Sequence, residues 1–206
     1  MNINRNFFDR KPAVVAQELL GKILVRKKEG KILAGWIVET EAYLGPGDKA
    51  SHSHRGMTKR NEVMFGPAGF SYVYFTYGMH WLLNLITEKE GKASGVLIRA
   101  LEPIADQNLK IENCELKISE CKIASGPAKL TKWLEVDCDL NKVDITKSEE
   151  LFVTNELVVT GVKYQSKRIT KKDIVATTRV GVDYAGDHKD LPLRFYIKDS
   201  KYISRA

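Results

Sequence analysis

The sequence is poor in the features that mark secreted, membrane-embedded and metal-binding proteins. Its 206 residues include three cysteines, none in a Cys-x-x-Cys pair and none with a histidine at metal-ligand spacing. No stretch approaches the roughly 20 uninterrupted apolar residues of a membrane span, and residues 1–6 lead into no hydrophobic signal-peptide core. These absences predict a protein that is not secreted, has no membrane partner, and works in the cytoplasm, or in the nucleus of a eukaryote.

Familiar catalytic and cofactor motifs are missing as well. There is no Gly-x-Ser-x-Gly nucleophile elbow and no P-loop phosphate cradle. The pair His52 and His54, with Asp48 and His80 as further candidate ligands, matches no familiar zinc spacing. The sequence therefore predicts an activity without a bound metal and without a nucleotide cofactor.

An excess of positive charge is what the composition does provide. Lys and Arg number 33 against 26 Asp and Glu, a net charge of +7, while 43% apolar and 29% charged residues are ordinary for a globular protein. A positive field attracts polyanions, so nucleic acid is the leading partner class, although a lysine-rich proteome would produce the same excess. At this length we expect one domain covering residues 1–206.

Hydrophobic periodicity predicts a sheet with few helices, an α+β protein. One helix begins after Asp9 as its N-cap, has Pro12 in its first turn and ends at Gly21, and another covers residues 125–134. The expected strands cover residues 23–25, 31–44, 70–77, 79–87, 96–101, 151–153, 157–159 and 193–197. Residues 104–122 mix charges of both signs and are expected to form a surface excursion or a solvated helix.

The strand expected at residues 31–44 is the first candidate for chemistry. Glu39, Glu41 and Tyr43 are two positions apart, so they share one face. The connection that follows is long enough to suggest a functional loop. If it returns His52 toward the strand, and Tyr74 points across from its own strand, three aromatic rings surround the carboxylates. Such a pocket would hold a planar ring, although Glu-x-Glu is also common on the solvent face of a strand.

Residues 72–77 are too aromatic for a single sheet face. Alternation places Tyr72 and Tyr74 opposite Tyr77, which burial of both faces would explain. Because Tyr77 directly precedes Gly78, it could instead protrude from a turn as a wedge into duplex DNA. A wedge of this kind in a basic protein indicates a function that involves base flipping.

Seven motifs follow one another along nearly the whole chain. They are VETEAYLGP at residues 38–46, HSHRG at 52–56, YVYFTYGM at 72–79, LIRALEP at 97–103, SGPAKL at 125–130, RVG at 179–181 and LRFY at 193–196. In order and spacing they resemble the alkyladenine (3-methylpurine) DNA glycosylase family. The resemblance implies a fold like the C-terminal domain of formyltransferases, a single domain around a curved, mainly antiparallel sheet with flanking helices.

The resemblance also implies a monofunctional DNA-repair enzyme. It would flip alkylated or deaminated purines out of duplex DNA and hydrolyse the N-glycosidic bond, leaving an abasic site. Glu41 would be the general base that activates water, Arg99 would help to hold that water or a neighbouring phosphate, and Glu39 would support them. The partner would be double-stranded DNA containing damaged purines, with no cofactor, metal or obligate protein partner.

The same resemblance assigns the residues that would bind the base. Tyr43, His52 and Tyr74 would stack on it and hydrogen-bond to it, and Asn84 would exclude guanine-type exocyclic groups. Tyr77 would intercalate into the duplex. Candidate contacts to the DNA backbone are basic residues of the long loop and of the acid-free segment 163–172, which could also be a solvated loop: Arg55, Lys59, Arg60, Lys167 and Arg168.

Two other classes of function remain open. A non-catalytic nucleic-acid-binding module could use the aromatic residues for stacking and the two glutamates as hydrogen-bond acceptors. A carbohydrate hydrolase could use Glu39 and Glu41, although two carboxylates on one face of one strand do not easily flank a sugar. Release of free base from damaged duplex would distinguish a glycosylase from the non-catalytic module, and polysaccharide hydrolysis would support the carbohydrate hydrolase.

Overall fold

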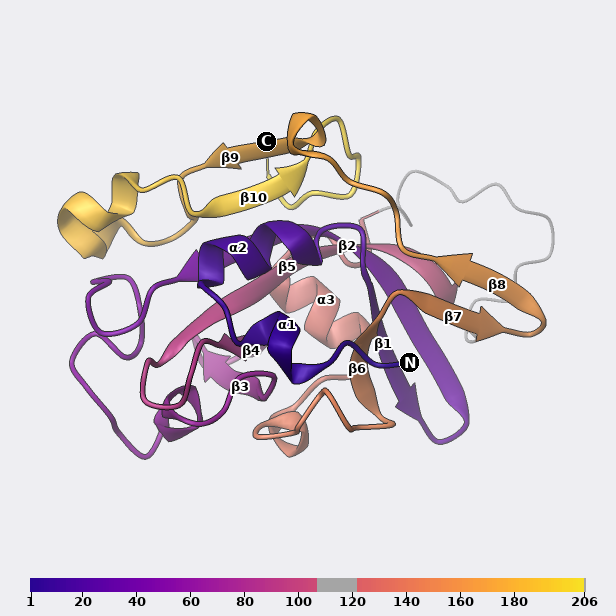
Figure 1. Ribbon diagram of the computed structural model, residues 1–206, viewed down its shortest axis with the longest axis horizontal. Coiled ribbons are helices and arrows are strands. Elements are labelled where there is room, and N and C mark those ends of the chain that lie inside the picture. The colour runs from indigo at the N-terminus through magenta and orange to yellow at the C-terminus, as the bar shows by residue number, and fades with distance from the viewer. Residues whose placement is uncertain (107–121, 206) are drawn as a thin grey trace.

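The computed structural model describes residues 1–106 and 122–205 (Figure 1). The helices are α1 (Arg5–Phe8), α2 (Pro12–Leu19) and α3 (Pro127–Trp133), and the 3₁₀ turns are η1 (Glu62–Phe65), η2 (Cys138–Leu140), η3 (Lys171–Asp173) and η4 (Asp183–Asp190). The strands are β1 (Ile23–Lys28), β2 (Lys31–Tyr43), β3 (Ser71–Thr76), β4 (His80–Thr87), β5 (Ser94–Asp106), β6 (Leu151–Thr154), β7 (Glu156–Val159), β8 (Val162–Gln165), β9 (Ile174–Thr177) and β10 (Arg194–Ile197). Most of the expected surface excursion, residues 104–122, lies outside the described residues.

The strands form one antiparallel sheet and a separate hairpin. The sheet order is β3-β4-β5-β2-β1-β6, with β10 paired to β2 and β9 paired to β10. The hairpin joins β7 and β8. With three helices beside this sheet, the predicted α+β class is confirmed.

The long central strand β2 is the base on which the site is built. It pairs with β5 along its length, with β1 beside its first half and β10 beside its second. The part that carries Glu39 and Glu41 therefore lies between β5 and β10. Gly35 permits the close pairing with β5, because a Cβ atom there would lie 2.9 Å from the carbonyl oxygen of Glu102.

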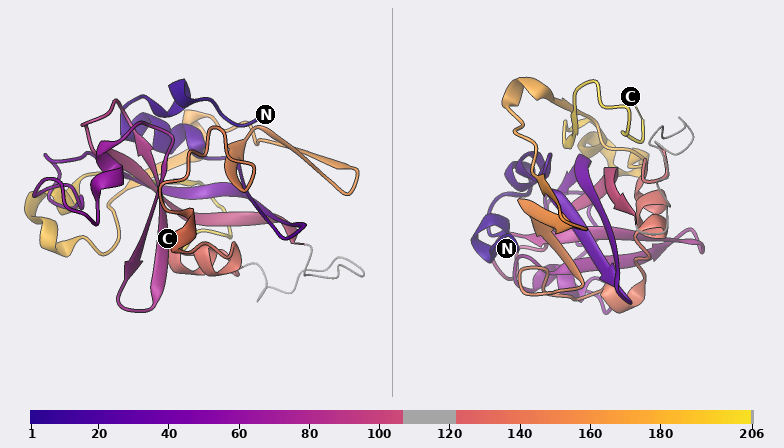
Figure 2. Two further views of the ribbon diagram at one scale, coloured as in Figure 1. Left: turned by 90° about the horizontal axis from the view of Figure 1, so that it is seen from below. Right: turned by 90° about the vertical axis from the view of Figure 1, so that its right-hand side faces the viewer.

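The helices lie on opposite sides of this sheet (Figures 1 and 2). α1 and α2 cover one face, where the hydroxyl of Thr40 donates to the carbonyl oxygen of Ala16 at 2.9 Å, and α3 lies on the other side. The predicted start of α2 is wrong, because Asp9 ends the short helix α1, and Lys11 precedes Pro12 as the N-cap. No helix among the described residues is long and apolar enough to span a membrane.

β3 and β4 form a hairpin that projects from the side away from α1 and α2 (Figure 2, left). Tyr77 and Gly78 make its turn with φ angles of 51° and 67°. Positive φ at both central residues is typical of tight hairpin turns whose twist matches the strands, and glycine adopts it without strain. The turn predicted at Gly78 is confirmed.

Candidate active site

A pocket of about 410 Å³ lies between the sheet, the long loop and the segment that follows β9. Six residues singled out from the sequence line it: Tyr43, His52, Tyr74, Tyr77, Asn84 and Arg99. Its volume is in the usual range for small-molecule sites. The structure thus brings together residues from four strands and a loop.

Glu41 is fully buried, and three groups that line the pocket hold its carboxylate. The backbone N–H of Val180 donates to Oε1 at 2.7 Å, and Nη1 of Arg99 lies 3.2 Å from the same oxygen. The Tyr43 hydroxyl donates to Oε2 at 3.0 Å. Burial and the charge of Glu41 raise the pKa of Tyr43 well above its usual value, so Tyr43 remains a donor at neutral pH.

Arg99 connects the two glutamates because the sheet is irregular at this point. The register between β2 and β5 shifts on either side of Glu39, which leaves Arg99 outside the ladder as a bulge. Its Nε donates to Glu39 at 3.0 Å, while Nη1 reaches Glu41. Burial by itself lowers the pKa of Arg99, but the two carboxylates outweigh this and raise it. The guanidinium therefore stays charged beneath the pocket.

Glu39 is surrounded by structural partners. Nε of Arg99 and Nε of Arg194 donate to Oε1 at 3.0 and 2.7 Å. Ser204 adds its N–H to Oε2 at 2.6 Å and its hydroxyl to Oε1 at 2.9 Å. Both glutamates are fully buried, but Arg194 and Ser204 do not line the pocket, whereas every partner of Glu41 does, so Glu39 is held away from a substrate. The role of Glu39 stays a prediction, and these contacts are of the kind that a supporting residue makes.

Ser204 is a positioning residue for Arg99, because its hydroxyl also accepts from Nη2 of Arg99 at 3.2 Å. Ser204→Ala removes this contact. It is expected to lower the single-turnover rate of the reaction that this site catalyses about fivefold, which corresponds to the free energy of about one hydrogen bond. Ser204→Thr keeps the hydroxyl and should restore the rate. Ser200→Ala, which touches neither glutamate nor Arg99, is the control. A Thr variant as slow as the Ala variant would contradict this role.

Aromatic side chains form one wall of the pocket. The ring centroids of His52 and Tyr74 are 4.4 Å apart at an interplanar angle of 66°, and those of Tyr72 and Tyr74 are 5.2 Å apart. Nδ1 of His52 is 2.9 Å from the Tyr72 hydroxyl. Partial burial and the charge of Arg60 lower the pKa of His52, which favours the neutral ring. The loop therefore returns His52 to the strands, as expected.

A buried ion pair joins the long loop to the segment that supplies Val180. The side chains of Asp48 and Arg179 are both 0% exposed, and the guanidinium contacts both carboxylate oxygens. Arg179 also donates to the carbonyl oxygen of Ala42 at 3.1 Å and lies 4.9 Å from the centre of the Tyr43 ring. Burial alone raises the pKa of Asp48, yet the hydrogen bonds and charge of Arg179, with hydrogen bonds from the backbone N–H groups of Leu44 and Ala50, outweigh it and keep this pKa below its usual value.

This ion pair makes stability depend on acid pH. Because the pKa of Asp48 is lower in the folded than in the unfolded state, the unfolded state takes up the proton first as pH falls below about 4. Stability is then lost at up to about 1.4 kcal/mol per pH unit. The free energy of unfolding, measured with denaturant between pH 6 and pH 3, should depend less steeply on pH for Asp48→Asn than for wild type. The control Asp187→Asn changes an exposed residue and should keep the wild-type dependence on pH. Equal slopes would contradict this.

Tyr77 was expected on the sheet face opposite Tyr74, and the structure corrects this. β3 ends at Thr76, so strand alternation does not extend to Tyr77, whose positive φ turns it beside the same pocket as Tyr74. Its side chain is 83% exposed. Burial on both faces applies instead to Tyr72 and Val73, which belong to the core.

The five basic residues predicted to contact DNA form two groups. One is exposed on the long loop: Arg55, Lys59 and Arg60. Arg60 is close to the pocket, because Nη2 donates to the carbonyl oxygen of Phe75 at 2.7 Å and the guanidinium lies 5.8 Å from the Tyr74 ring. Lys167 and Arg168 lie apart from it and line a separate hollow beside α2. Of these five residues, Arg60 is the one that the described contacts place beside the site.

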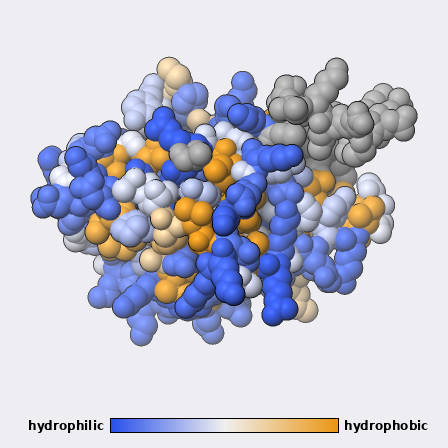
Figure 3. All heavy atoms as spheres, turned by 90° about the horizontal axis from the view of Figure 1, so that it is seen from above, coloured by the Kyte–Doolittle hydropathy of each residue, from blue (hydrophilic) through white to orange (hydrophobic). Residues whose placement is uncertain are grey.

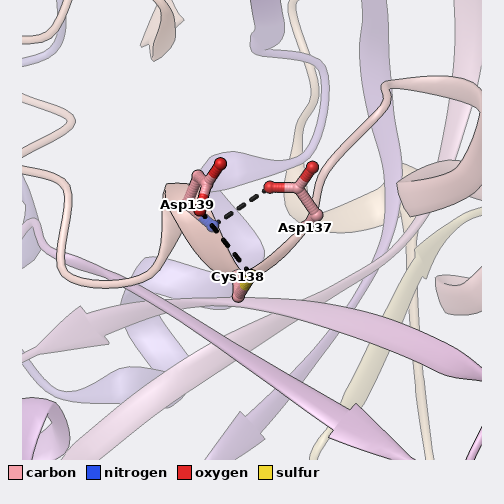
Figure 4. Close-up of side chains that lie close together, drawn as sticks. All are labelled: Asp137, Cys138 and Asp139. Atoms are coloured by element: carbon pink, nitrogen blue, oxygen red, sulfur yellow. Dashed lines mark hydrogen bonds between the residues drawn. The ribbon is translucent and has the colours of Figure 1, made fainter.

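Asp137, Cys138 and Asp139 are a further group that could hold a metal ion (Figure 4). They are neighbours in the chain around the start of η2, away from the pocket lining. The N–H of Asp139 donates to Asp137 at 3.0 Å, and the Cys138 thiol lies 3.7 Å from the Asp139 carboxylate. These contacts cap the turn, and we assign the group no chemistry.

Sequence reasoning missed the residues that complete the site from distant parts of the chain. They are Tyr72, Val180, Arg194 and Ser204, together with the ion pair of Asp48 and Arg179. The RVG and LRFY motifs marked two of these segments. Neither motif indicated that its arginine would be buried against a carboxylate.

Comparison with known proteins adds the family. The profile of the Methylpurine-DNA glycosylase (MPG) family matches residues 6–201. A protein of Carboxydothermus hydrogenoformans is 47% identical over 205 residues, covering 100% of both chains. A protein of Methanocella arvoryzae is 45% identical over 201 residues, covering 98% of this chain and 94% of its own, and both are provisionally named 3-methyladenine DNA glycosylase. This chain therefore belongs to the methylpurine-DNA glycosylase family of DNA-repair hydrolases.

Proposed function

We propose that this chain releases alkylated or deaminated purines from duplex DNA, acting as one domain formed by residues 1–206. The damaged nucleotide flips into the pocket, water replaces the base at the sugar, and an abasic site remains. Flipping costs a few kcal/mol, least where damage already weakens the pair. The observation that carries the proposal is Glu41, a buried carboxylate whose three hydrogen-bond and ion-pair partners all line a pocket with aromatic walls.

Glu41 is the general base in this proposal. As the bond between C1′ and the purine nitrogen breaks, its electron pair leaves with the base and positive charge develops on the sugar. The carboxylate stabilises that charge and takes a proton from the water whose oxygen bonds to C1′. Val180 and Arg99 occupy Oε1, so we assign the proton to Oε2, which accepts from Tyr43.

The aromatic wall accounts for the choice of base. Alkylated purines carry positive charge or are electron-poor, so the faces of Tyr43 and Tyr74 favour them through cation–π attraction. Asn84 is 7% exposed on β4, and its amide donates to the carbonyl oxygen of Tyr72 at 3.3 Å. An amide fixed in this way excludes a base whose exocyclic group would meet it.

Base release itself is the test. Duplexes carrying 3-methyladenine, 7-methylguanine, hypoxanthine or ethenoadenine are incubated with the protein, then cleaved with heat and alkali, and the released bases are separated by chromatography. Free base from at least one lesion and none from undamaged duplex is expected. Prolonged dialysis against EDTA should not change the rate, and borohydride should trap no protein–DNA adduct. Binding without any base release would overturn the proposal and favour the non-catalytic module.

A further inference from the structure

A second hollow, of about 600 Å³, lies between α2 and residues 166–174. Four basic side chains line it: Lys22, Lys167, Arg168 and Lys171. The lining also contains Glu18, but Arg10 contacts both oxygens of that carboxylate at 3.1 and 2.8 Å. The hollow therefore has a positive lining.

Two of these four cations have no anionic partner among the residues that the structure describes. Arg168 and Lys171 are exposed, and neither forms an ion pair with a carboxylate of residues 1–106 or 122–205. Lys22 donates to the side-chain oxygen of Asn155 at 3.0 Å, and burial lowers its pKa, so a nearby anion would favour its charged form. Lys167, in contrast, is paired with Glu102.

The hollow lies on the opposite side of the sheet from the pocket. Thr40, whose hydroxyl contacts α2, alternates along β2 with Glu39 and Glu41, which face the site. The hairpin that carries Tyr77 projects away from α2, and the segment from β8 to β9 passes beside that helix (Figures 1 and 2). The surface seen from above is mainly hydrophilic (Figure 3). DNA is stiff over about 150 base pairs, so a straight duplex at the pocket cannot also reach this hollow.

We propose that the hollow beside α2 binds the phosphate backbone of a second, undamaged segment of duplex DNA while the pocket holds the first. This inference goes beyond the proposed function and shares with it only the premise that DNA is the partner. A protein that contacts two segments can pass from one to the other without dissociating fully, which shortens the search for rare lesions.

The arrangement of the cations favours a duplex over a small anion. Arg168 and Lys171 are three positions apart on an exposed segment that continues with Lys172. Cations spread in this way neutralise successive phosphates and release counterions, so binding weakens steeply with salt. A single small anion is instead held by donors that converge on one point.

A capture experiment tests the proposal. A duplex with a stable abasic-site analogue is immobilised and saturated with protein, and fluorescent undamaged duplex is then added. Wild type should retain the second duplex, and the double variant Arg168→Ala/Lys171→Ala should retain at least about tenfold less of it. The slope of log binding constant against log salt concentration should also be smaller in magnitude by about 2 for this variant. The matched control Lys31→Ala/Lys147→Ala removes two exposed charges elsewhere and should behave as wild type.

Single-turnover base release from a short lesion duplex is the second measurement, and it should be equal in all three proteins. The proposal is overturned if wild type retains no second duplex at low salt or if the hollow variant retains as much. Loss of base release in that variant would show that both residues contact the duplex held at the pocket, which would also overturn the proposal. Displacement by inorganic phosphate at constant ionic strength would indicate a small-anion site. Failure of wild-type base release counts against the proposed function alone.

Discussion

Glu41→Gln is expected to lower the single-turnover rate of base release by at least about 100-fold, the usual range for removing a general base. The amide keeps the size of the side chain and can still accept from Val180 and Arg99. It has no negative charge to stabilise the sugar and takes up a proton poorly. Because Arg99 retains Glu39 as an anionic partner, the fold should persist. The rate is measured with protein in excess, and binding to duplex with an abasic-site analogue should stay close to that of wild type.

Glu39→Gln is the matched control on the same strand. It leaves Arg99 and Arg194 buried with a weakened acceptor, and breaking a buried charge pair costs about 3–5 kcal/mol. Its melting temperature should fall, and its activity should follow the folded fraction. A Glu39→Gln protein that folds stably but is inactive, beside a Glu41→Gln protein that still turns over, would show that the two roles are reversed.

The parts of the site that could be predicted depend on short-range pattern. Two-residue alternation places Glu41 and Tyr43 on one face of a strand, and both hold that relation in the structure through their direct hydrogen bond. His52 required the further assumption that the loop folds back, which its contact with Tyr72 satisfies. The roles of these residues in catalysis stay predictions.

The parts that were missed depend on closure between distant segments. Val180 meets Glu41 across 139 positions of chain, and Ser204 meets Glu39 across 165. Nothing local distinguishes an arginine that will be buried from one that stays in solvent, so Arg179 and Arg194 could not be placed. The bulge at Arg99 is equally invisible, because register shifts arise from pairing and not from composition.

Errors in the fold have similar causes. The helix start was placed at Asp9 because α1 is a single turn, held by contacts such as that of Arg5 with Asp144 and not by periodicity. The strand β9 was missed because its residues show no clear alternation of burial and its partner among the described strands is β10, further along the chain. Strands whose burial comes from distant partners carry little local signal.

Tyr77→Ala is expected to lower the rate of base release from a stable lesion pair by about 30-fold, roughly 2 kcal/mol of the flipping equilibrium. Tyr77 is 83% exposed at the tip of the projecting hairpin, where it can fill the space that a flipped base leaves. Alanine also carries a Cβ atom, so the backbone strain at this positive φ does not change. Because the ring packs against nothing in the core, the melting temperature should stay at the wild-type value.

The dependence on DNA separates a wedge from a merely structural residue. Opposite an abasic gap less stacking must be broken, so Tyr77→Ala should excise there at close to the wild-type rate. Phe75→Ala is the aromatic control on the same hairpin, because the Phe75 ring packs 4.7 Å from that of Trp81. It should lower the melting temperature and reduce the rate equally on both duplexes. A Tyr77→Ala protein with the behaviour of this control, destabilised and slowed alike on both substrates, would exclude intercalation by Tyr77.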